Sequence, residues 1–196
     1  MSEAQTLARS HVDIAPAIAS AIRLVILDVD GVLTDAGVYV GRTQSGEAVE
    51  LKKFDIQDGI GIKLLQDAGI EVVIVSGRES EATTLRAAEL GLTCYQIPGA
   101  YKLPTVARML TERGLDWSQA AMMGDDLPDM AILKRVGLPV CVANATPEVL
   151  DVVAWRARAR GGNGAVREFA RALLLARGDW DAAVHRYVSE REKSEA

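Results

Sequence analysis

Two carboxylates, Asp28 and Asp30, stand directly after a short apolar run at residues 24–27 that predicts a buried strand. Gly31 follows them and lets the backbone turn sharply. Acids two residues apart at the carboxyl end of a strand lie where open α/β sheets place their ligands. One carboxylate could attack an electrophile while the other transfers a proton, and both could hold a hard cation through oxygen. The motif alone would equally suit a solvated acidic turn after a core strand.

Three further segments carry polar residues that suit a bound phosphoryl group. Ser76 ends a predicted strand, and its hydroxyl could donate to a phosphoryl oxygen, as could nearby backbone N–H groups. Lys102 begins a predicted helix, where its ammonium could neutralise the phosphoryl charge. The acids of residues 124–129 (GDDLPD) follow another predicted strand and would complete a Mg²⁺ site.

Each of these segments also has a plain structural interpretation. The Ser-Gly-Arg of residues 76–78 is a common turn, Lys102 could be a solvated first-turn residue, and Asp126 and Asp129 could cap a short helix. All the segments nevertheless occur in one order, each at the carboxyl end of a strand. This combination favours one phosphate-binding site over unrelated surface features.

Strands and helices are predicted to alternate along the chain. Strands are expected at residues 24–27, 71–75, 93–97, 120–123, 139–142 and 153–155. Helices are expected at 58–68 (capped by Asp58), 80–90, 102–113 and 165–177, with short ones beginning at 128 and 147. This alternation predicts an α/β fold, a Rossmann-like doubly wound parallel sheet with helices on both faces.

One segment, residues 37–51, interrupts the alternation. Apolar and polar residues alternate on both sides of a polar turn at 42–46, which predicts a β-hairpin. A two-stranded hairpin has little stability alone, so we expect it to lie on its own domain or on another subunit.

Composition is that of one globular domain. The chain has 196 residues, of which 49% are hydrophobic and 25% charged. A net charge of −5 argues against nucleic acid as the partner, and no apolar run approaches transmembrane length. Cys94 and Cys141 are expected to be reduced, and with no secretion leader this predicts a cytoplasmic protein. We expect an N-terminal extension (1–20), the main domain (21–178) and a C-terminal tail (179–196).

The motifs together resemble the haloacid dehalogenase superfamily of phosphatases over about residues 23–177. DVDGVLTD (28–35) is similar to its first motif, IVSGR (74–78) to its second, Lys102 to its third and GDDLPD (124–129) to its fourth. Within the superfamily, FDIQDG (54–59) and GGNGAVRE (161–168) resemble the family of 3-deoxy-D-manno-octulosonate 8-phosphate (KDO 8-phosphate) phosphatases. That family would place the protein in lipopolysaccharide precursor synthesis.

The resemblance implies a role for each motif residue. Asp28 would attack phosphorus to form an aspartyl-phosphate, and Asp30 would protonate the leaving sugar oxygen and then deprotonate water. Mg²⁺ would be held by the Asp28 carboxylate, the Asp30 backbone carbonyl and Asp125, while Ser76 and Lys102 stabilise the transferred group. Two residues would support the site: Asp129 would orient Lys102, and Asp126 would orient a ligand or water.

Substrate contacts and specificity follow less directly from the sequence. The candidates are Asp30, Asp55, Ile56, Gln57, Asp58, Gly59, Lys63, Arg78, Arg86 and Lys102. The closer family usually has arginine where this chain has Gln57, Lys63 and Asn163, and a lost guanidinium is a lost bidentate carboxylate clamp. A nine-carbon sugar acid 9-phosphate, of the sialate or deaminated sialate type, is therefore the alternative substrate.

No cap domain fits between the motifs, so a lone subunit would leave its site open to water. We expect a homotetramer assembled through the hairpin at 37–51, with the glycine-rich segment at 161–164 closing a neighbour's site. Two other classes share some of these residues: a phospho-accepting receiver module and a catalytically idle oligomerisation module. The hairpin disfavours the first and the intact acid, serine and lysine set disfavours the second.

Overall fold

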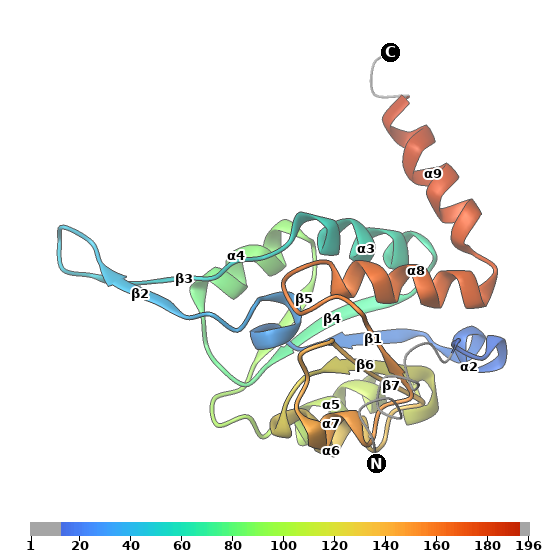
Figure 1. The fold of residues 1–196 in the computed structure, drawn as a ribbon, viewed down its shortest axis with the longest axis horizontal. Helices are drawn as coiled ribbons and strands as arrows, with labels where there is room; N and C mark the ends of the chain where they lie inside the picture. The colour runs from blue at the N-terminus through green and yellow to red at the C-terminus, as the bar shows by residue number, and fades with distance from the viewer. Residues whose placement is uncertain (1–12, 193–196) are drawn as a thin grey trace.

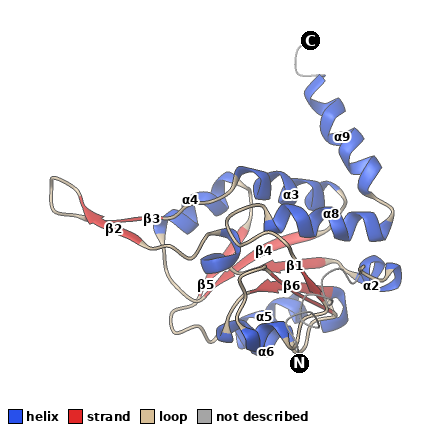
Figure 2. Ribbon diagram, in the orientation of Figure 1, coloured by secondary structure: helices blue, strands red, loops and turns tan. Residues whose placement is uncertain are grey.

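A six-stranded parallel sheet forms the centre of the protein. The computed structural model describes residues 13–192, drawn in Figures 1 and 2. The strand order is β5-β4-β1-β6-β7-β8, and every neighbouring pair is parallel. The strands are β1 (Leu24–Leu27), β4 (Glu71–Ser76), β5 (Thr93–Gln96), β6 (Ala120–Gly124), β7 (Leu138–Cys141) and β8 (Trp155–Arg156). All residues of β1 and β6 are buried, as expected for strands covered on both faces.

Helices cover both faces of this sheet. Figure 2 shows α3, α4 and α8 on one face and α5 and α6 on the other, where Figure 1 also labels α7. The helices are α2 (Pro16–Ala21), α3 (Ile56–Asp67), α4 (Glu81–Glu89), α5 (Lys102–Glu112), α6 (Met130–Leu133), α7 (Pro147–Leu150), α8 (Ala165–Arg177) and α9 (Trp180–Glu192). The predicted doubly wound α/β sheet is confirmed.

The strand order places a switch point beside β1. The chain runs outward from β1 through β4 to β5, then returns to β6 on the other side of β1 and continues to β7 and β8. The carboxyl ends of β1, β4 and β6 therefore lie together where the chain reverses direction, which is where doubly wound sheets bind ligands. Asp28, Ser76 and Asp125 lie at these three strand ends, and Lys102 begins α5 after β5.

The predicted hairpin forms a second, separate sheet. Strand β2 (Tyr39–Arg42) pairs antiparallel with β3 (Ala48–Leu51), and Figure 1 shows the pair extending away from the body. Val40 is 79% exposed and Leu51 63%. Within residues 13–192 the insertions among the sheet elements hold this hairpin and single helices, so the described chain is capless as expected.

Most predicted strand and helix ends lie within two residues of the observed ones, and three details differ from the prediction. Asp55, not Asp58, caps α3, since its carboxylate accepts the N–H of Gln57 at 2.7 Å. The last strand covers Trp155–Arg156 instead of residues 153–155. The expected C-terminal tail contains the helix α9. Its first residue, Trp180, packs against the guanidinium groups of Arg167 and Arg171, whose Cζ atoms lie 4.9 and 5.4 Å from the ring centroid.

The predicted N-terminal extension is described only from residue 13. Its helix α2 packs on α8 through the fully buried Ala19, and Ile22 just beyond the helix is also fully buried. Residues 1–12 lie outside the described part of the chain. None of the described helices combines the length and apolar character needed to cross a membrane.

Candidate active site

The turn after β1 is shaped to bring its two acids beside the end of β6. Asp28 extends the ladder, donating its N–H to the Met123 carbonyl, and then the chain turns through Val29–Leu33. Gly31 has a φ of +94°, and a Cβ there would lie 2.0 Å from Oδ2 of Asp125, so only glycine fits. Thr34 braces the turn, because its hydroxyl donates to the Val29 carbonyl and accepts the Gly31 N–H.

Lys102 links two acids of the site. It is the first residue of α5 and its side chain is buried, with Nζ donating to Oδ1 of Asp28 at 2.7 Å and to Oδ1 of Asp129 at 2.8 Å. Burial alone would lower the pKa of this lysine, but the two carboxylates outweigh burial and raise it. The ammonium is therefore held charged beside Asp28. The predicted orientation of Lys102 by Asp129 matches this geometry.

Three carboxylates converge on one point that suits a cation. Ligand oxygens of Asp28, Asp125 and Asp129 lie within 4.8 Å of one another. Burial, with the charge of Asp129, raises the pKa of Asp28 to about 7, and burial, with the charges of Asp28 and Asp129, raises that of Asp125 to about 8. Oδ1 of Asp125 is buried without a hydrogen-bond partner. Crowded, incompletely neutralised carboxylates are the oxygen donors that Mg²⁺ takes, so the residues fit this ion.

This cluster differs in part from the predicted ligand set. Asp129 joins it, although its Oδ1 is bound to Lys102 and its Oδ2 accepts the N–H of Asp125. The Asp30 side chain faces other partners, and its backbone carbonyl stays a predicted ligand. Asp126 points its carboxylate to the N–H of Leu127, the next residue along the chain, so its support of the site also stays a prediction.

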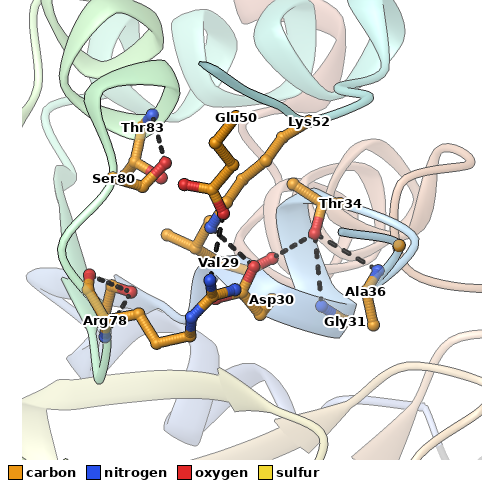
Figure 3. A network of polar contacts seen from close by, with 12 residues as sticks. Val29, Asp30, Gly31, Thr34, Ala36, Glu50, Lys52, Arg78, Ser80 and Thr83 are labelled. Atoms are coloured by element: carbon orange, nitrogen blue, oxygen red, sulfur yellow. Dashed lines mark hydrogen bonds and ion pairs between the residues drawn. The ribbon is translucent and has the colours of Figure 1, made fainter. Parts of the chain in front are cut away.

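Asp30 lies in a second, positively charged environment. Lys52 donates from Nζ to Oδ1 of Asp30 at 2.7 Å, and Nη1 of Arg78 lies 3.7 Å from Oδ2. Arg78 also donates to Glu50 at 3.1 Å, and Figure 3 shows these side chains gathered around Asp30. Arg78 therefore lies beside Asp30, and its contact with substrate stays a prediction. The two acids of the DxD motif have different partners, which suits two different roles.

Ser76 is buried at the end of β4. The register of β1 and β4 pairs Leu27 with Ile74, which puts Ser76 close to the turn that begins at Asp28. Its hydroxyl accepts the N–H of Arg78 and donates to the Arg78 carbonyl. A Cβ at the following Gly77 would lie 3.6 Å from Cε of Lys102, so the strand end packs against the lysine stem.

Several predicted substrate contacts have partners within the fold, and their contacts with substrate stay predictions. Asp58 is buried and accepts the N–H of Arg167 at the start of α8. Gly59 lies against Arg86, which donates to the carbonyl of Asp55 and pairs with Glu89. Ile56 and Gln57 are exposed, so their contacts with substrate remain predictions.

Lys63 and the glycine-rich segment also have partners within the subunit. Lys63 pairs with Asp67, four residues further along α3, and its contact with substrate stays a prediction. A Cβ on Gly161 would lie 1.8 Å from the Gly31 carbonyl oxygen, so this segment packs directly on the turn of its own chain. Asn163 accepts from Lys53 at 2.7 Å. Closure of a neighbour's site by this segment stays a prediction.

The sequence reasoning missed Lys52 and Glu50. Both come from the end of the hairpin, and together they surround Asp30 with Arg78. A signal was present, because two charged residues at alternate positions of a strand share one face. The signal was not recognised because charged residues are common on an exposed strand.

Comparisons with known proteins agree with this geometry. A family model for haloacid dehalogenase-like hydrolases matches residues 97–166. The chain is 41% identical over 162 residues to the 3-deoxy-D-manno-octulosonate 8-phosphate phosphatase KdsC of Escherichia coli (strain K12), covering 83% of this chain and 84% of that protein.

Two solved structures of similar proteins contain ligands. One is the 3-deoxy-D-manno-octulosonate 8-phosphate phosphatase of Moraxella catarrhalis in complex with magnesium, phosphate and KDO, with a TM-score of 0.81 at 32% identity, covering 88% of this chain and 97% of that one. The other is the cobalt-bound phosphatase YrbI of Haemophilus influenzae, with a TM-score of 0.75 at 35% identity, covering 83% and 93%. The chain therefore belongs to the haloacid dehalogenase superfamily and, within it, to the family of KDO 8-phosphate phosphatases.

Proposed function

We propose that this protein hydrolyses KDO 8-phosphate to KDO and inorganic phosphate with Mg²⁺. The observation that carries the proposal is the buried Asp28 carboxylate, paired with Lys102 beside two further acids at the switch point of the sheet. The relatives named above, one of them solved with KDO, phosphate and magnesium, support the choice of substrate.

In the first half of the reaction, Asp28 attacks phosphorus and Asp30 gives a proton to the departing sugar oxygen. The P–O bond to the sugar breaks as the bond from the carboxylate to phosphorus forms, which leaves an aspartyl-phosphate. Lys102 and Ser76 donate hydrogen bonds to the equatorial oxygens, where negative charge is spread in the transition state. Asp28, Asp125 and the Asp30 carbonyl would hold Mg²⁺, with Asp129 next to them. When bound, the ion supplies positive charge that offsets the repulsion between carboxylate and phosphate.

In the second half, water takes the phosphoryl group from Asp28. Asp30, now ionised, accepts the water proton, and phosphate leaves with the Asp28 carboxylate restored. Lys52 and Arg78 beside Asp30 suit its ionised form in this step. The residue roles in both halves are parts of the proposal.

A panel of sugar phosphates tests the proposal. KDO 8-phosphate, sialate 9-phosphate and its deaminated analogue would be compared for phosphate release with and without Mg²⁺. We expect Mg²⁺-dependent turnover that is fastest on KDO 8-phosphate. Preference for a nine-carbon substrate would assign the specificity to Gln57 and Asn163, whose side chains lie near the start of α3 and α8. Failure to turn over any of them would favour a receiver or an idle oligomerisation module.

The variant Asp28→Asn tests the nucleophile. It keeps the shape of the side chain but removes the attacking charge, so turnover on every substrate should fall by about 10⁴-fold or more, as when other enzymes lose a nucleophile. Wild-type rates in this variant would refute the covalent mechanism. Thermal unfolding of the variant checks that the fold is unchanged.

We also propose that the enzyme is a cytoplasmic homotetramer joined through the hairpin at 37–51. Val38, Tyr39, Val40 and Leu51 expose apolar surface on a two-stranded sheet that has little stability of its own. The two cysteines are free, which suits a reducing compartment. Light scattering and fractionation of cells that express the full chain test these two points.

A further inference from the structure

Lys52 is a buried lysine that has no step of its own in the proposed mechanism. Its side chain is fully enclosed, and its Nζ donates to Oδ1 of Asp30 at 2.7 Å. A bond of this length between an ammonium and a carboxylate is of the strong, charge-assisted kind. Among residues 13–192, the other carboxylate oxygen, Oδ2, has only the longer 3.7 Å contact with Arg78, whose side chain is half exposed. Oδ1 of Asp30 is thus held by Lys52, and Oδ2 remains available for proton transfer.

The hairpin delivers this lysine to the site. Glu50 lies in β3, and Lys52 is the first residue after the end of that strand. The two side chains therefore share a face, while the exposed Leu51 between them points outward. Glu50 accepts a hydrogen bond from Arg78, which restrains the guanidinium near Asp30. Figure 3 shows Glu50 and Lys52 reaching Asp30 from the same segment. Two of the three charged groups around Asp30 therefore come from the hairpin.

We propose that Lys52 is a positioning residue that fixes the orientation of Asp30 for proton transfer. It occupies Oδ1 and directs Oδ2 at the leaving oxygen. Oδ2 gives its proton to the sugar oxygen as the P–O bond breaks, and the lysine keeps all of its own protons. The proposal rests on the proposed function, since Asp30 is a general acid only in a phosphatase. A displacement of about 1 Å can cost about 10²-fold in rate, which sets the expected size of the effect.

The first test compares two leaving groups in the variant Lys52→Met, which keeps the length of the side chain without its charge. The measured quantity is kcat/KM, because it reports phosphoryl transfer to Asp28 and not the later hydrolysis. We expect a fall of about 10- to 100-fold for KDO 8-phosphate but less than about threefold for p-nitrophenyl phosphate, whose leaving group needs no proton. The control is Lys134→Met, at an exposed residue at the end of α6. Equal losses on both substrates would overturn the proposal.

The second test asks whether Lys52 acts through Asp30. In an Asp30→Asn background, the change Lys52→Met should cause no further loss of kcat/KM on KDO 8-phosphate, because the group it positions is gone. A further loss as large as in the wild-type background would mean that Lys52 acts elsewhere, and would overturn the proposal.

A third measurement needs no activity. Urea unfolding of the wild type, both single variants and the double variant should show non-additive changes in the free energy of unfolding, as expected for two groups in direct contact. Additive changes would show that the pair is not formed in solution and would overturn the proposal. If the wild type prefers another sugar phosphate, that substrate replaces KDO 8-phosphate in the first two tests. If it hydrolyses none, the proposed function fails, and unfolding still decides whether Lys52 holds Asp30.

Discussion

Replacing Lys102 by methionine should destabilise the metal-free protein by an amount that depends on pH. The lysine is the buried partner of both Asp28 and Asp129, at 2.7 and 2.8 Å. Removing one partner of a buried ion pair costs about 3–5 kcal/mol, because the remaining charge is left without compensation. At about pH 8.5 in a chelator, we expect Lys102→Met to lose free energy of unfolding in that range.

The sign of the pH dependence follows from proton binding. The pKa of Asp28 is raised to about 7 even with Lys102 present, so the variant will bind a proton at a higher pH than the wild type does. Between about pH 8.5 and 7 the folded variant then holds up to one proton more, and each pH unit is worth about 1.4 kcal/mol. Because Asp28 of the wild type is itself half protonated near pH 7, the penalty should shrink by at most about 1.6 kcal/mol over this interval as pH falls.

Urea unfolding at the two pH values, with Lys134→Met as control, measures this penalty. A penalty that is the same at both pH values would refute the reasoning, because it would mean that the carboxylates left behind do not take up a proton. The absence of any penalty would mean that Lys102 is not an ion-pair partner in solution. In the presence of Mg²⁺ the variant should also lose about 10²–10³ in kcat/KM on KDO 8-phosphate, the cost of one lost transition-state donor.

Three other predictions concern the general acid Asp30, the buried acid Asp58 and the hairpin. Asp30→Asn should lower kcat/KM far more for KDO 8-phosphate than for p-nitrophenyl phosphate, and equal losses would remove Asp30 from the acid role. Burial raises the pKa of Asp58 to about 6, above its unfolded value, so wild-type stability should rise relative to Asp58→Asn as pH falls from about 6 to 4. Urea unfolding should show a gain of about 2 kcal/mol over this interval, and a constant difference would contradict the reasoning. Replacing both Val38 and Val40 by lysine should give species smaller than a tetramer by light scattering, and an unchanged mass would show that the hairpin is not the interface.

The sequence predicted those parts of the fold and site that depend on neighbouring residues. The buried strands are runs of apolar residues, and the acids at their carboxyl ends follow them directly. Asp28 and Lys102 could be placed together because a parallel sheet brings its strand ends to one edge. These predictions needed only local pattern and the usual topology of such sheets.

The residues that sequence reasoning misplaced depend on contacts between distant segments. Asp58 looked like the cap of its own helix but accepts from Arg167 of α8, 109 positions away. Lys52 meets Asp30 only because the hairpin leaves and re-enters the domain beside the first turn. The helix α9 begins where Trp180 packs on two arginines of α8, and no local sequence pattern predicts this contact.

Because Lys52 lies at the base of the hairpin, the proposed tetramer would make the reaction rate per subunit depend on enzyme concentration. The outward residues Val40 and Leu51 belong to the proposed subunit interface, and Lys52 follows Leu51 directly. Dilution until the subunits separate would release the hairpin and, with it, Lys52, which holds Asp30 in place. Specific activity on a sugar phosphate would then fall with dilution, while p-nitrophenyl phosphate would be affected much less. Rates measured at nanomolar enzyme and at cellular concentration would in that case differ, because Asp30 would be positioned by Lys52 only in the assembled enzyme.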